Sequence, residues 1–230
     1  MYKAKESDLT GRFFCARRVP AVPSDVASLQ GLLRVSARAI IRGMQTVASI
    51  LWRRLDAPGH DACRLQRNAS AWQLDGAAVF RLEHGRIGQL QYRVQCDLHW
   101  HTQWGTVRGW LGGGTVDLAI ARDARGHWKL NGRPVADLSH CIDLDLGFTP
   151  ATNLLQLRRL RLAVGEGADA PAAWVDLDGG GTLSELMQRY ERTADDAYAY
   201  QAKRFGYAAT LCATGEGFVR DYPGLWTAET

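Results

Sequence analysis

An alternation of apolar and polar residues between Gly88 and Trp104 constrains the fold of this chain more than any other feature. The even positions carry the apolar side chains, with Thr102 as the polar exception: Leu90, Tyr92, Val94, Cys96, Leu98, Trp100 and Trp104. The odd positions are polar or charged. A period of two over this length predicts one long strand, or two strands kept in phase, with one face toward solvent. Antiparallel sheets show this pattern, whereas parallel sheets buried on both faces do not.

Turn signals recur about every ten residues after Met44, and they separate further short runs typical of strands. Asp75-Gly76 and Asn131-Gly132 are predicted hairpin turns, and the glycines at 112–114 a flexible hairpin connection. Leu157–Val164 is predicted to be one of the later strands. Because helical periodicity is scarce in this region, we predict an all-β, or nearly all-β, single domain.

The positive charge of the chain is concentrated in its first fifth. Residues 1–43 have a net charge of +5 and the remainder −1, which together make the +4 of the whole chain. We therefore divide the chain into an N-terminal extension, residues 1–43, and a β domain, residues 44–230. Three interpretations of the extension stay open: an upstream segment from a misplaced start, a loosely attached helix beginning at Ser24, and a basic helix that lies on a membrane.

Composition excludes several classes of protein. Hydrophobic residues make up 46% and charged residues 23%, as in globular domains, and no run of about 18 apolar residues could span a membrane. The near-neutral body argues against a nucleic-acid partner. Five cysteines without C-x-x-C spacing, and no secretory signature, predict reduced thiols and a cytoplasmic location.

A long strand with one apolar face needs a cover, which can be a second sheet, a closed barrel or a ligand. The predicted apolar face is rich in large aromatic residues, among them Tyr92, Trp100, Trp104 and Tyr190. Aromatic walls suit amphiphiles and sugars, because the rings offer flat apolar area and tyrosine adds a hydroxyl group. A core filled by bulky side chains explains the same composition.

The most distinctive motif runs from Cys141 to Asn153 and contains the sequence Asp143-Leu144-Asp145. On an extended segment the two carboxylates share a face, where they could bind a cation or act as acid and base. The arginine pair Arg158-Arg159 follows shortly after. We predict that the carboxylates and arginines form a half-buried polar network, with Asp143 and Arg158 as partners.

Other motifs predict no chemistry. His99 and His101 have the spacing of two zinc ligands, but no third ligand is evident. The glycines at 112–114 and 179–181 lack the Lys-Ser/Thr of a phosphate-binding loop. His140 and Cys141, as neighbours on a strand, would point to opposite faces and could not form a dyad. We therefore predict no metal, no cofactor and no catalytic residue.

Four segments resemble a known bacterial family, described as putative glycolipid-binding and formerly as a domain of unknown function. They are CIDLDLGFTPATNLLQLRRLRLAVG (141–165), QRYERT (188–193), YAYQAKRFGYAATL (198–211) and GFVRDYPGLW (217–226). The resemblance runs from about Met44 to the end of the chain. His140 and Gln156 depart from it, since the family usually has glycine and proline there.

This resemblance implies a single large antiparallel sheet curled into an open or half-closed barrel, similar to the bacterial carriers that hold acyl chains in an apolar concavity. The predicted partner is a glycolipid or other amphiphile, and contact with a membrane and the oligomeric state are left open. Acyl chains would lie on the aromatic face and the head group would meet the polar motif. The predicted ligand-binding residues are Asp143, Asp145, Asn153, Arg158, Arg159, Tyr92, Trp100, Trp104 and Tyr190.

Two alternatives remain. One is a structural or protein-interaction barrel without a small ligand. The other is an enzyme acting on glycoconjugates through Asp143 and Asp145.

Overall fold

The computed structural model describes residues 43–229, apart from residues 83, 84 and 178. Residues 1–42 lie outside this range, so the division of the chain at residue 43 and the three interpretations of the extension stay predictions. None of the helices in the described ranges is long and apolar enough to cross a membrane.

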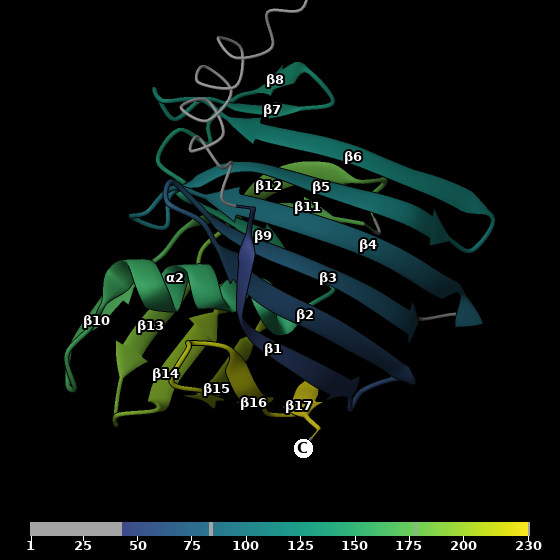
Figure 1. Cartoon of the computed structure of the whole chain (residues 1–230). Helices are drawn as coiled ribbons and strands as arrows, with labels where there is room; N and C mark the ends of the chain where they lie inside the picture. The colour runs from purple at the N-terminus through teal and green to yellow at the C-terminus, as the bar shows by residue number, and fades with distance from the viewer. Residues whose placement is uncertain (1–42, 83–84, 178, 230) are drawn as a thin grey trace, which may run out of the picture. The chain divides into compact units, whose positions relative to one another are not determined.

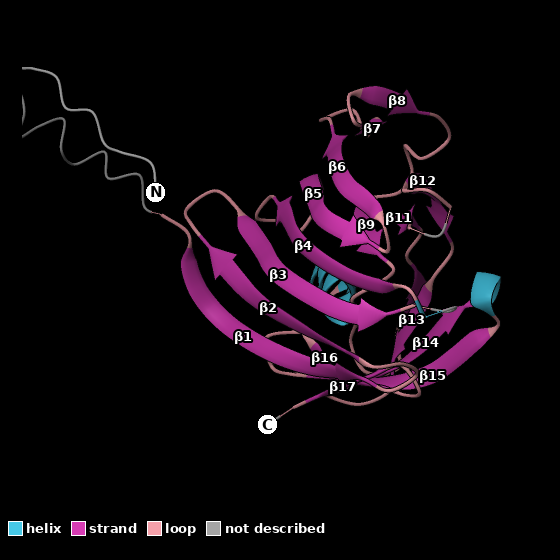
Figure 2. Cartoon of the chain, turned by 90° about the vertical axis from the view of Figure 1, so that its right-hand side faces the viewer, coloured by secondary structure: helices cyan, strands magenta, loops and turns pink. Residues whose placement is uncertain are grey.

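Fourteen strands form one large antiparallel sheet that curls without closing into a barrel (Figures 1 and 2). Their order across the sheet is β10 (Gly167–Asp169), β13 (Arg189–Arg192), β14 (Ala197–Ala202), β15 (Tyr207–Ala213), β16 (Val219–Tyr222), β17 (Trp226–Ala228), β1 (Gln45–Arg54), β2 (Gly59–Arg67), β3 (Trp72–Arg81), β4 (Ile87–Cys96), β5 (Thr102–Leu111), β6 (Gly114–Arg122), β7 (Trp128–Leu130) and β8 (Arg133–Val135). The last strand, β17, pairs with the first, β1, and so joins the two halves of the chain. The predicted curled, mostly β architecture is confirmed.

A smaller sheet and one helix lie inside the curl. The small sheet consists of β9 (Asp143–Leu146), β11 (Ala172–Asp176) and β12 (Thr182–Leu186), and β9 pairs with β11 in parallel. The short helix η2 (Pro150–Thr152) leads into α2 (Asn153–Leu160), and η3 (Lys203–Phe205) connects β14 to β15. The strand predicted at Leu157–Val164 is therefore wrong, because α2 includes its first half and ends where Arg161 turns left-handed, at φ 50°.

The segment from Cys141 to Leu160 covers the concave face of the large sheet. Its Phe148 ring lies 6.0 Å from Phe80 and 5.8 Å from Tyr92, measured between ring centroids. Leu144 occupies the space beside Gly105, where a Cβ atom would lie 2.5 Å from the leucine. Leu90, Tyr92 and Val94 are consequently buried beneath the chain itself. The prediction that this face lines a lipid-binding cavity is wrong.

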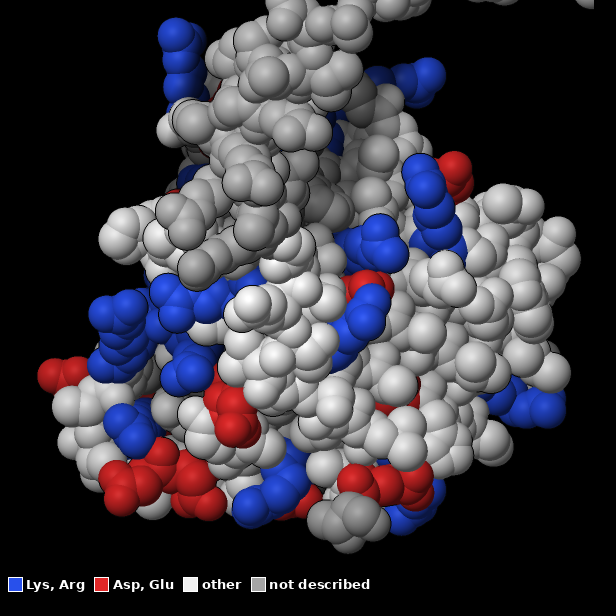
Figure 3. All heavy atoms as spheres, viewed as in Figure 1, with Lys and Arg blue, Asp and Glu red and all other residues white. Residues whose placement is uncertain are grey.

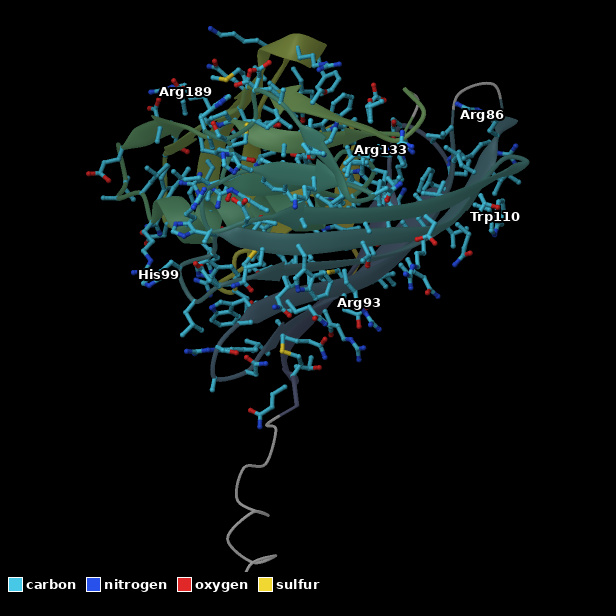
Figure 4. All side chains as sticks on the ribbon, turned by 90° about the horizontal axis from the view of Figure 1, so that it is seen from above. Arg86, Arg93, His99, Trp110, Arg133 and Arg189 are labelled. Carbon is cyan, nitrogen blue, oxygen red and sulfur yellow. The ribbon has the colours of Figure 1, made fainter. Side chains whose placement is uncertain are left out.

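The alternating run from Gly88 to Trp104 consists of two strands, β4 and β5, joined by a turn at 97–101. The Asp97 carboxylate accepts hydrogen bonds from the backbone amides of His99 and His101 and thereby shapes this turn. In Figure 4, His99 lies at this end of the sheet, Trp110 lies near the other end, and Arg93 is on the outer side of β4.

A β-bulge follows the turn and reverses the phase of β5. Cys96 pairs with Thr102, but Gln95 pairs with Trp104, so one residue of β5 has no partner across the strand. Trp104 therefore shares the convex face with Gln95 and Ala121, its neighbours on either side. The prediction that Trp104 lies on the concave face is wrong for this reason.

Two predicted turns had different outcomes. Asn131 and Gly132 form the β7–β8 hairpin turn, and both have positive φ values, 50° and 77°. Asp75 and Gly76 lie instead in the middle of the continuous strand β3. Gly76 stands opposite Tyr92, and a Cβ atom there would come within 2.3 Å of the tyrosine ring. The glycine thus provides space for a core side chain rather than a reversal of the chain.

This packing makes Gly76→Ala a test of the fold. Because the added methyl group collides with the buried Tyr92 ring, we expect the variant to lose roughly 1–3 kcal/mol of unfolding free energy, measured by urea denaturation. Gly113→Ala is the matched control, because no atom lies within 4 Å of its Cβ position. Equal stability of the two variants would contradict the assigned register.

Candidate functional site

The predicted site residues do not form one site. Asn153, at the start of α2, lines a pocket together with Asp145, whereas Arg158, near the end of the helix, lines a second pocket together with Trp100. Asp143, Arg159 and Tyr190 make the buried contacts between β9, β13 and α2. Tyr92 belongs to the core, and Trp104 faces outward.

We call the first site the aromatic pocket, a cavity of about 410 Å³ between the small sheet and strands β14–β17. Six aromatic side chains line it: Trp174, Tyr200, Phe205, Tyr207, Tyr222 and Trp226. Trp174 meets Phe205 edge to face at 5.4 Å, and the Arg204 guanidinium lies 4.6 Å from the Trp174 ring centroid. Gly147 is required opposite Trp174, since a Cβ atom would lie 2.2 Å from the indole nitrogen.

A chain of hydrogen bonds orients the polar side chains of the aromatic pocket. Gln188 donates from Nε2 to Asp145 Oδ2, and the Tyr190 hydroxyl donates to Gln188 Oε1 over 2.9 Å. Asn153 in turn donates from Nδ2 to the Tyr190 hydroxyl over 2.7 Å. Asp145 Oδ1 accepts no hydrogen bond from the described residues, and Asp145 lines the pocket. One carboxylate oxygen is therefore available to a ligand.

Burial raises the pKa of Asp145 from 3.8 to about 6, against the hydrogen bond from Gln188, and the nearby Asp143 carboxylate raises it further. At neutral pH the group is thus mostly ionised, and a carboxylate accepts stronger hydrogen bonds than a neutral oxygen. Sequence reasoning missed Gln188 as a functional residue. The available signal was its spacing, two residues before Tyr190, which puts both side chains on one face of an extended segment.

The second buried carboxylate, Asp143, pairs with Arg159. The guanidinium donates from Nε to both carboxylate oxygens, at 3.0 and 3.1 Å, and from Nη2 to Oδ2 at 2.6 Å. Asp143 is fully buried, which raises its pKa, while the Arg159 charge and hydrogen bonds oppose that rise. The predicted polar network exists, but Arg158 as the partner of Asp143 is wrong.

Arg158 lies instead in the second site, which we call the arginine pocket, a cavity of about 740 Å³. Its guanidinium is 5.9 Å from the Trp100 ring centroid, and its Nε is buried without a hydrogen-bond partner. Trp100 stacks on Trp72 at 4.5 Å between centroids. Arg161 and Arg192 also line this pocket, and Figure 3 shows Lys and Arg side chains gathered over the α2 region. Asp195 and Asp196 line it too and offset part of the charge.

The comparisons with known proteins identify the family. The model of the family described as putative glycolipid-binding matches residues 49–228. The chain belongs to this putative glycolipid-binding family. A crystal structure of a DUF1089 family protein from Pseudomonas aeruginosa is similar, with a TM-score of 0.65 and 28% sequence identity over 74% of this chain and 91% of that one. No curated protein matches the chain. The predicted family membership is confirmed, and a binding role is supported in outline.

A buried polar cluster around Asp61 was not predicted from the sequence. Asp61 on β2 is fully buried, and its Oδ2 accepts hydrogen bonds from the hydroxyl groups of Tyr92, at 2.9 Å, and Thr149. Its Oδ1 has no partner. Burial raises the pKa of Asp61 from 3.8 to about 7, although both hydroxyl groups lower it. The sequence contained a signal for this position: Asp61 stands two residues before Cys63 and four before Leu65, so on a strand all three side chains lie on the same, inward face.

The neighbouring arginines of α2 offer a matched test of the ion pair. Arg159→Met should lose roughly 3–5 kcal/mol of unfolding free energy, because it leaves the buried Asp143 carboxylate unpaired. Arg158→Met should lose only about 1 kcal/mol, the magnitude of a cation–π contact. In urea denaturation, Asp143→Leu should couple strongly to Arg159→Met and not to Arg158→Met. Additive losses for Asp143 and Arg159 would contradict the assignment.

Asp61 should govern part of the pH dependence of stability. Its folded-state pKa is raised, so its contribution is fully present below about pH 4 and is lost as the pH rises through about 7. The difference between the two pKa values corresponds to roughly 4 kcal/mol. Between about pH 4 and pH 8, the wild type should therefore lose several kcal/mol more than Asp61→Asn. Asp117→Asn, which removes an exposed carboxylate on β6, is the control. Identical pH profiles for the wild type and Asp61→Asn would refute this role.

Proposed function

We propose that this protein binds the sugar head group of a glycolipid or another carbohydrate-bearing amphiphile in the aromatic pocket. The observation that carries the proposal is the combination of aromatic walls with Asp145, a buried carboxylate that retains one unbonded oxygen. A sugar ring presents apolar C–H faces to aromatic rings and hydroxyl donors to a carboxylate. The volume of about 410 Å³ is within the range of small-molecule sites.

The family description supports a ligand of this class. An alkyl chain would leave the pocket along the apolar side chains Leu186, Phe205 and Leu225, of which Phe205 is 54% exposed. This location replaces the concave face of β4 and β5, which the chain itself covers. Membrane contact of the protein follows only if the ligand is taken up from a bilayer.

The geometry favours binding over hydrolysis. Glycosidases use a pair of carboxyl groups that flank the scissile bond. Among the described residues that line the aromatic pocket, Asp145 is the one acidic side chain, and Asp143 is occupied by Arg159. The two aspartates of the motif therefore lack the arrangement that the enzyme hypothesis requires.

Binding of n-octyl glucoside below its micellar concentration tests this proposal, with isothermal titration calorimetry as the measurement. We expect Asp145→Ala to weaken binding by roughly ten- to 100-fold, the effect of losing a charged hydrogen-bond acceptor. Trp174→Ala should weaken it by a similar factor through the lost stacking surface. Trp110→Ala is the matched control, because Trp110 is an exposed tryptophan on β5, outside the pocket.

Comparison with 1-octanol separates recognition of the sugar from recognition of the alkyl chain. The proposal predicts that 1-octanol binds much more weakly than the glucoside and is insensitive to Asp145→Ala. Equal affinity for the two probes would show that the pocket recognises only the alkyl chain and would contradict the proposed recognition of the sugar. If neither probe binds, the alternative of a structural or protein-interaction domain without a small ligand would replace the proposed function.

A further inference from the structure

Three side chains with metal-binding chemistry converge beside the small sheet, and none of them lines the aromatic pocket. They are His140 and Cys141, which precede β9, and Glu185 on β12. The backbone amide of Cys141 donates to the Leu138 carbonyl over 2.9 Å, so this segment is a tight turn rather than a strand. Because successive side chains in a turn need not alternate, His140 and Cys141 point to the same place. The prediction that they would face apart is wrong.

The donor atoms lie close to the positions that a tetrahedral metal ion requires. His140 Nε2 is 3.7 Å from Cys141 Sγ and 2.6 Å from Glu185 Oε1, and the three donor atoms all lie within 4.8 Å of one another. Ideal Zn²⁺ bond lengths would separate sulfur from nitrogen by about 3.6 Å and nitrogen from oxygen by about 3.4 Å. The sulfur–nitrogen distance already fits. The carboxylate would have to retreat by less than ~1 Å, and Glu185 is an exposed side chain free to do so.

The Cys141 thiol and the Glu185 carboxylate both contact the same nitrogen atom, His140 Nε2. A catalytic triad would instead use Nδ1 for the carboxylate and Nε2 for the thiol. The Glu185 carboxylate adds negative charge that favours a cation at this place, and a bound metal ion would hold the cysteine as a thiolate.

The surroundings hold this cluster in place. The Cys141 carbonyl accepts hydrogen bonds from Arg122 Nε at 3.1 Å and Trp128 Nε1 at 3.0 Å. These contacts fix the main chain at the cysteine, while His140 and Glu185 stay accessible from solvent, with side chains 51% and 39% exposed. The site therefore combines a buried, fixed sulfur ligand with two solvent-exposed, adjustable ligands.

We propose that His140 Nε2, Cys141 Sγ and the Glu185 carboxylate bind one Zn²⁺ ion, with a water molecule or small ligand in the fourth position. Thiolate with imidazole selects zinc or another thiophilic metal over magnesium and calcium. The ion would link the turn before β9 to β12 and so clamp the small sheet. This site is independent of the proposed sugar binding, and it departs from the prediction that the chain holds no metal.

Titration of the full-length, chelator-treated protein with Co²⁺ and Zn²⁺ tests the site. We expect one equivalent of Co²⁺ to produce a sulfur-to-cobalt charge-transfer band in the near ultraviolet, and Zn²⁺ to displace it. Cys141→Ser should abolish the band, while His140→Ala and Glu185→Gln should each weaken Zn²⁺ binding by roughly tenfold or more. Zn²⁺ should also raise the melting temperature of the wild type and not of these variants.

Two control variants make the test specific. Cys212→Ser removes a partly buried thiol and His99→Ala removes an exposed histidine in the β4–β5 turn, and neither residue belongs to the cluster, so both variants should keep wild-type Zn²⁺ binding. If Cys141→Ser does not fold, the two exposed ligands decide the question, since neither supports the core. Absence of the charge-transfer band, or unchanged Zn²⁺ affinity in His140→Ala and Glu185→Gln, would overturn the proposal.

Discussion

The packing of one segment, Cys141–Leu160, against the concave face of the curled sheet is the interaction on which the rest of this structure depends. A sheet of fourteen strands that does not close leaves a large apolar surface, and burial of that surface is the main favourable term in folding. Phe148 contacts Phe80 and Tyr92 and anchors the segment at its middle. The two ends of the segment, β9 and α2, are thereby brought together, and the Asp143–Arg159 pair joins them.

Both pockets follow from this arrangement. The start of α2 carries Asn153 to the aromatic pocket, and the end of α2 carries Arg158 to the arginine pocket. The two aspartates of the motif therefore have different surroundings: Asp143 pairs with Arg159 on the helix, and Asp145 lines the aromatic pocket. A buried charge is costly unless it is paired, and the Arg159 guanidinium meets this requirement for Asp143.

Alternation was sufficient to predict that residues 88–104 form strands and that the domain is nearly all-β, because a residue's face in a strand depends on local geometry. The same reasoning failed where the role of a residue depends on its pairing with another strand. Gly76 follows an aspartate as turn glycines do, yet its function is to admit the Tyr92 ring from the next strand. Trp104 has the correct parity for the inner face, but a bulge at the start of β5 turns it outward. The residue types of the site were predictable, whereas choosing Arg159 over Arg158 required knowing that a helix follows η2 and what its phase is.

A crystal structure of the protein with n-octyl glucoside tests the central claim most directly, namely that the chain fills its own concavity and leaves the aromatic pocket for a ligand. We predict that the sugar lies against Trp174 with a hydroxyl group within hydrogen-bond distance of Asp145 Oδ1, and that Phe148 stays in contact with Tyr92. Density for the alkyl chain against Leu90 and Tyr92, with the Cys141–Leu160 segment displaced, would contradict the account.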